Sequence, residues 1–85
     1  MKKMVKVEEV EDEGLMALIG ERVLIFCARY IYEGELVGVN TDCILLKDAG
    51  IVYETGPLVP GGKYKDRQAL PRQWYVARGA IESFG

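Results

Sequence analysis

The sequence contains no histidine, only two cysteines and a single serine, and these shortages limit its chemistry. A zinc site of the cysteine and histidine type is excluded, because two thiolates, Cys27 and Cys43, cannot complete a tetrahedral shell. No histidine base stands beside Ser83, and "PGGKYK" (60–65) lacks the spacing of a phosphate-binding loop. We therefore expect no enzymatic activity, no metal site and no cofactor.

The sequence also lacks an apolar run long enough to cross a bilayer. The basic start Met1-Lys2-Lys3 leads into an acidic stretch (8–13) instead of an apolar one, so no signal peptide is predicted. Both cysteines fall on predicted strands, where we expect packing thiols in a reducing compartment and no disulfide. These features predict a soluble, cytoplasmic protein with no membrane partner.

Length and charge bound the domain and its partners. A chain of 85 residues predicts a single domain over 1–85, whose core is small enough that self-association usually helps it. The net charge of −2 argues mildly against a general nucleic-acid binder. The charge is uneven, because "EEVEDE" (8–13) is acidic and "KYKDRQALPR" (63–72) is mostly basic. Each run fits either a solubilising surface or contact with a charged partner.

The hydrophobic pattern predicts a short helix followed by five strands. Apolar residues at helical spacing predict the helix over 11–19, with Gly20 ending it. The segment 4–10 alternates like a strand and leaves an additional edge strand open. Prolines and glycines predict a long loop over 55–73. β-branched and aromatic residues predict the strands, which cover 21–30, 30–39, 43–54, 74–79 and 80–84.

Two glycines inside one predicted strand indicate how the sheet is shaped. Five short antiparallel strands must curl to bury a core, which favours a mainly β, strongly bent open barrel. Strand side chains alternate with period two, so Gly34 and Gly38 are expected together on the concave face. There a glycine lets the strand bend and lets the crossing sheet approach. The alternative is an ordinary meander that tolerates both glycines.

Three segments resemble the Sm-like (LSm) family. "GELVGVNTDCILLKDA" (34–49) resembles its first signature, in which two glycines flank a leucine, an acid or amide follows, and a hydrophobic strand ends in Asp-Ala. "VARGAIESF" (76–84) resembles its Arg-Gly turn and the strand after it, and "LIGERVLI" (18–25) resembles its helix-to-strand junction. The resemblance implies an N-terminal short helix followed by a strongly bent five-stranded antiparallel open barrel, an Sm-like or SH3-like small barrel.

The resemblance also implies a homo-oligomeric ring that binds single-stranded RNA, often rich in uridine, near its pore. The nucleotides would lie between the turn after the second strand and the Arg-Gly turn. The corresponding RNA-binding residues are Asn40, Thr41, Asp42, Arg78 and Gly79. Asn40 would supply an amide, Asp42 a carboxylate acceptor, and Arg78 a charged planar guanidinium.

The turn at 39–44 departs from the family, because it is short and has no aromatic residue, histidine or methionine. A plain turn closed by Asx hydrogen bonds at Asn40 and Asp42 is therefore an alternative to nucleotide binding. The alternative for Arg78 is an ion pair with Glu82 or with an acidic residue of a neighbouring subunit. The alternative function is a structural or protein-binding ring of the same fold that has lost the nucleotide pocket.

Self-association is expected under both functions. An open barrel leaves two edge strands, here 74–78 and 81–84, with unpaired backbone groups. Pairing one copy's first edge with the next copy's second edge is a head-to-tail contact that can close into a ring. The resemblance implies a ring of six or seven subunits, and the shortened turns leave a smaller ring of five open, so we expect five to seven.

Overall fold

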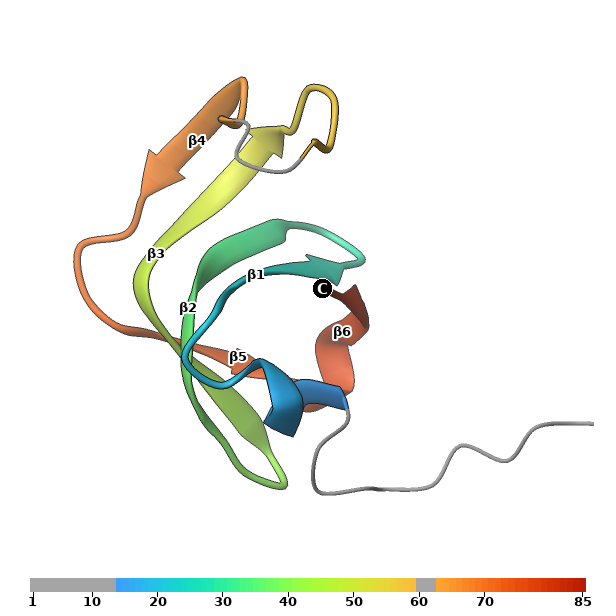
Figure 1. Cartoon of the computed structure of the whole chain (residues 1–85), viewed down its shortest axis with the longest axis vertical. Coiled ribbons are helices and arrows are strands. Elements are labelled where there is room, and N and C mark those ends of the chain that lie inside the picture. The colour runs from blue at the N-terminus through green and yellow to red at the C-terminus, as the bar shows by residue number, and fades with distance from the viewer. Residues whose placement is uncertain (1–13, 60–62) are drawn as a thin grey trace, which may run out of the picture.

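The computed structural model describes residues 14–59 and 63–85, which form one strongly bent antiparallel sheet (Figure 1). The strands run in the order β4-β3-β2-β1-β6, and β5 also pairs with β3. This arrangement confirms the predicted mainly β, strongly bent antiparallel sheet, with six strands where five were predicted. The elements are η1 (Gly14–Leu18), β1 (Arg22–Cys27), β2 (Ile31–Val39), β3 (Cys43–Glu54), β4 (Asp66–Ala69), β5 (Trp74–Ala77), η2 (Arg78–Ala80) and β6 (Ile81–Phe84).

The ends of the predicted elements are partly wrong. The helix expected over 11–19 is a short 3₁₀ helix over Gly14–Leu18, and residues 11–13 and the alternative strand at 4–10 lie outside the described residues. The last two strands are separated by η2, a 3₁₀ turn at Arg78–Ala80.

The segment predicted as a loop, 55–73, contains the strand β4. Its sequence, DRQA, has no β-branched or aromatic residue, so the pattern gave no sign of it. β4 pairs with Gly50–Glu54 of β3, and β5 pairs with Cys43–Leu46 of the same strand. Since β2 occupies the other edge of β3, β4 and β5 lie one after the other along one edge. They are two halves of one strand interrupted between Leu70 and Gln73.

The core lies inside the bend of the sheet. β1, β2, β3, β5 and η1 each send buried apolar side chains into it, and Cys27 packs against them as a free thiol. Cys43 is also a free thiol and is half-buried. The buried cluster consists of Leu15, Val23, Ile25, Leu36, Ile44, Leu46, Ala49 and Val76.

Gly34 sits where β2 and β3 approach closely. A Cβ atom at this position would lie 3.0 Å from the carbonyl oxygen of Lys47 and 3.1 Å from Cα of Ala49. The pairing register shifts here, because β3 carries one extra residue at Asp48, whose φ is +49°. Such a bulge bends and twists a strand. The prediction that Gly34 permits the bend is therefore confirmed.

The expectation that Gly38 shares this face is wrong. A second register shift, between Leu36 and Gly38, inserts one residue into β2 and reverses its alternation. As a result Val39 packs against the core, whereas a Cβ at Gly38 would point at Leu45, outside the buried cluster. Gly38 does not mark a close approach of two strands.

A buried carboxylate holds β4 to the rest of the sheet. Glu33, on β2, is 5% exposed and accepts hydrogen bonds from Arg22 (2.7 and 2.8 Å) and Arg67 (2.9 Å). Both arginines also donate to the carbonyl oxygen of Asp48, at 3.0 and 2.9 Å. We refer to Arg22, Glu33 and Arg67 as the Glu33 clasp. The hydrogen bond to Glu33 raises the pKa of Arg22.

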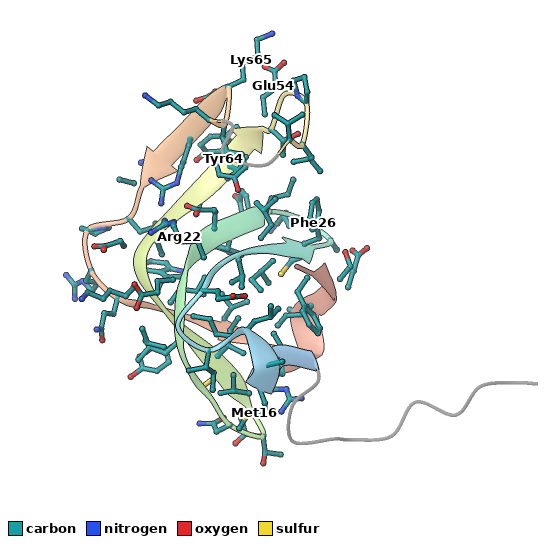
Figure 2. All side chains as sticks on the ribbon, in the orientation of Figure 1. Met16, Arg22, Phe26, Glu54, Tyr64 and Lys65 are labelled. Carbon is teal, nitrogen blue, oxygen red and sulfur yellow. The ribbon has the colours of Figure 1, made fainter. Side chains whose placement is uncertain are left out.

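The absence of a side chain at Gly50 makes room for the Glu33 clasp. A Cβ there would collide with the guanidinium group of Arg67, 2.6 Å from its Nε. Beyond the clasp, the β3–β4 hairpin projects from the barrel and carries the exposed Lys65–Glu54 ion pair (3.3 Å) at its far end (Figure 2). The clasp thus fixes the base of this hairpin, at the opposite end of β3 from the predicted RNA-binding turn.

Candidate nucleic-acid interface

The turn between β2 and β3 is closed by the side chain of Asn40. Its Oδ1 accepts hydrogen bonds from the backbone N–H groups of Asp42 and Cys43, both at 2.8 Å. Its own backbone N–H donates to the carbonyl of Cys43 at 3.0 Å. This is the Asx turn expected as the alternative to nucleotide binding. The side-chain oxygen of Asn40 is therefore engaged within the turn, and its NH₂ group remains on the exposed side chain.

Arg78 joins this turn to η2. Its backbone N–H donates to the carbonyl of Asp42 at 2.9 Å, and its guanidinium Nη1 donates to the carbonyl of Asn40, also at 2.9 Å. The expected meeting of Arg78 with the turn is thus found, across a sequence separation of 38 residues. The alternative partner, Glu82, makes no ion pair with Arg78 in the described part of the chain.

The sequence-predicted residues form one continuous surface. Asn40, Thr41 and Asp42 are exposed, Arg78 is half-buried, and Gly79 follows it in η2. No atom lies within 4 Å of the position a Cβ would take at Gly79, so this glycine leaves open space beside the arginine.

The surface offers hydrogen-bond donors on Asn40 and Arg78, an acceptor on Asp42, and a hydroxyl on Thr41. These groups can bind the edge of a base or a phosphate. They include no aromatic ring on which a base could stack.

A tyrosine-lined groove beside this surface was not predicted from the sequence. It has a volume of about 610 Å³ and runs between β5, η2, β6 and the β1–β2 turn. Tyr30 and Tyr32 meet edge to face inside it, with ring centroids 6.3 Å apart. Burial raises the pKa of the Tyr32 phenol, and the nearby Cys27 and Tyr30 add to the effect. Because the groove joins segments distant in sequence, no local pattern could have revealed it.

The described residues show no arrangement typical of a catalytic centre. Burial raises the pKa of Cys27, with Glu82 adding to the effect, so the thiol is poorly suited to act as a nucleophile. No group of three or more potential ligand side chains could hold a metal ion within 14–59 and 63–85. In the same ranges, no helix has both the length and the apolar character needed to span a membrane.

The fold and the joined turns define a class, the small β-barrels of Sm-like fold. A solved structure with this fold is that of a Pyrococcus abyssii Sm protein in complex with a uridine heptamer. It superposes with a TM-score of 0.57 over 84% of this chain and 89% of that one, at 14% sequence identity. At this identity the likeness establishes the fold. No family model and no curated protein matches the sequence.

Proposed function

We propose that the protein binds single-stranded RNA as a homo-oligomeric ring, at the surface formed by the Asn40–Asp42 turn and Arg78-Gly79. The observation that carries the proposal is the double hydrogen bond from Arg78 to this turn, at 2.9 Å from both its backbone and its side chain. It makes two distant segments into one site. The fold supports the proposal, because a protein that shares it was solved with a uridine heptamer.

The arginine has a defined role in this proposal. Nη1 of Arg78 is engaged by the carbonyl of Asn40, so the remaining N–H groups of its guanidinium are those that can meet a phosphate or a base face. Asn40, Thr41 and Asp42 are exposed beside it and contact the base edge. Gly79 lets the RNA backbone come close to this turn.

Ring formation follows from the two unpaired edges. Among residues 14–59 and 63–85, β5 pairs only with β3 and β6 only with β1, so each keeps one edge without a strand partner there. Both strands have four residues, which allows one to pair along the full length of the other. Tyr75 on β5 is 67% exposed, as is typical of an aromatic side chain that a neighbour covers. The two edges differ, so the contact is head-to-tail, and the ring we propose closes after about five to seven copies.

Binding of fluorescein-labelled heptauridine and heptaadenosine tests the proposal, by anisotropy at low salt. We expect wild-type protein to bind the RNA and Arg78→Ala to bind it more weakly. The affinity of Arg78→Ala should also depend less on salt than that of the wild-type protein. The slope of log K against log salt becomes shallower by about 0.7 for each phosphate of a single strand that the variant no longer neutralises. Arg72→Ala is the matched control, because Arg72 is an exposed cation outside the site.

The same measurement distinguishes the alternative function. If neither RNA binds to the wild-type protein at low salt, the structural or protein-binding ring takes the place of the RNA-binding one. That alternative is favoured by the tyrosine-lined groove and by the lack of an aromatic ring in the turn. Neither function requires a catalytic activity or a cofactor, and both are compatible with the cytoplasmic location that we continue to predict.

A further inference from the structure

The hydrogen bonds within the Asn40 turn limit which base it can read. Two N–H groups, of Asp42 and Cys43, point at the side-chain oxygen of Asn40, and this requires the oxygen and not the NH₂ group at that position. The backbone carbonyl oxygen of Asn40 accepts a hydrogen bond from Nη1 of Arg78. The side chain of Asn40 therefore faces a ligand with donors only.

The carboxylate of Asp42 is the charged acceptor at the tip of the turn, next to the hydroxyl of Thr41. The backbone of Asp42 is held on both sides, since its N–H donates to Asn40 and its carbonyl accepts from Arg78. The Asp42 side chain is exposed and has no hydrogen-bond or ion-pair partner among the described residues. A carboxylate presents two acceptor oxygens side by side.

The four bases differ in how they meet this pair of groups. Guanine has two adjacent donors, N1–H and N2–H, which match the two oxygens of Asp42, and its O6 accepts from the NH₂ group of Asn40. Uracil has a single N–H between two carbonyls, so the second carboxylate oxygen would face a carbonyl oxygen. Adenine and cytosine offer one amino group next to a ring acceptor, which produces the same repulsion.

We propose that the turn selects a guanine base in single-stranded RNA, with Asp42 reading N1–H and N2–H and Asn40 reading O6. This inference rests on the proposed function, of which it specifies the ligand. Arg78, bound to the backbone of the same turn, adds a positive charge to this surface, which counters the repulsion between the Asp42 carboxylate and the RNA backbone.

Four labelled heptamers test the assignment, with guanosine, inosine, adenosine or uridine at the central position of a uridine strand. We expect the guanosine strand to bind about tenfold more tightly than heptauridine, which is the discrimination typical of a bidentate base contact. Inosine lacks the N2 amino group and should fall between them. In Asp42→Asn, which keeps the shape of the side chain and the backbone bonds, all four strands should bind with similar affinity.

Asp66→Asn is the control, because it removes one negative charge from an exposed residue of β4. If Asp42→Asn and Asp66→Asn change the four affinities equally, the effect is one of charge and the base assignment is wrong. Equal binding of all strands by the wild-type protein overturns the guanine assignment while leaving RNA binding in place. Failure of every strand to bind overturns both. Guanosine monophosphate, added at the same concentration as the RNA, should not displace the labelled guanosine strand. If it displaces that strand as well as unlabelled RNA does, the ligand is a free nucleotide and not RNA.

Discussion

Replacing Gly34 by valine should destabilise the barrel, because the new side chain would clash with the bulge of β3 that lies opposite Gly34. A first carbon at this position already lies 3.0, 3.1 and 3.3 Å from atoms of Lys47 and Ala49, two of which belong to the backbone. Backbone atoms at a bulge cannot rotate away as a flexible side chain does. The φ of Gly34 is not in the left-handed region, so the effect of the substitution is steric and not conformational.

The expected loss for Gly34→Val is about 1–3 kcal/mol, the range for overpacked interiors, and Gly34→Ala should fall at its lower end. With a urea m-value of about 1 kcal/mol/M for a chain of this size, the unfolding midpoint should drop by roughly 1–3 M. Urea titrations followed by tryptophan fluorescence measure this, at several protein concentrations because assembly adds to stability.

Gly38→Val is the matched control for the same strand. Its first carbon would meet only Cβ of Leu45, at an ordinary 3.8 Å, and valine favours strands, so we expect a change within about 0.5 kcal/mol. The reasoning is refuted if Gly34→Val is as stable as Gly38→Val.

Three further predictions follow from the edges, the clasp and the buried titratable groups. Ala77→Pro should give monomers, measured by light scattering coupled to size exclusion. The backbone N–H of Arg78 faces β3, so the N–H of Ala77 faces outward, and the φ of Ala77, −64°, already suits proline. An unchanged assembly would show that β5 does not form the contact between subunits. Glu33→Gln should lower the free energy of unfolding by about 1–3 kcal/mol in urea titrations, because it leaves two arginines without their buried carboxylate partner. Glu54→Gln, at the exposed ion pair, should change this free energy by less than about 0.5 kcal/mol. Equal effects of the two variants would contradict a stabilising role of the Glu33 clasp. Burial raises the pKa of Cys27 and Tyr32 above their ordinary values of 9.0 and 10.0. The stability that these two groups contribute is present below those values and is lost as pH rises through the folded pKa. Urea midpoints should therefore fall above about pH 9, and the first part of this fall should be absent in Cys27→Ala.

Local patterns carried the predictions that proved right. Gly34 is visible because a glycine within an apolar strand has few other uses, and the Asn40 turn is visible because its hydrogen bonds span only two and three residues. The meeting of Arg78 with that turn was expected from a family resemblance, since nothing local joins residues 38 apart.

The features that were missed depend on contacts between distant residues. β4 has an unremarkable polar sequence, and it is held in the sheet by Arg67, whose partner Glu33 lies 34 residues earlier. The extra residue in β2 that turns Gly38 outward has no signature in the alternation of side chains. The groove exists only because the β1–β2 turn, β5 and β6 come together after folding.

The Glu33 clasp separates the barrel, where inserted residues would disturb the strand pairing, from the connection between β3 and β4, where they would not. Arg22, Glu33 and Arg67 hold the β3–β4 hairpin at its base. Glu54 and Lys65 lie at the far end of this hairpin, and Figure 1 shows the β2–β3 turn at the other end of β3 (Figures 1 and 2). Extra residues in the connection between β3 and β4 enlarge a loop whose closure becomes costlier by only about 0.6 kcal/mol for each doubling of its length. This connection is therefore a place to insert an affinity tag or a fluorescent reporter away from the Asn40 turn and Arg78.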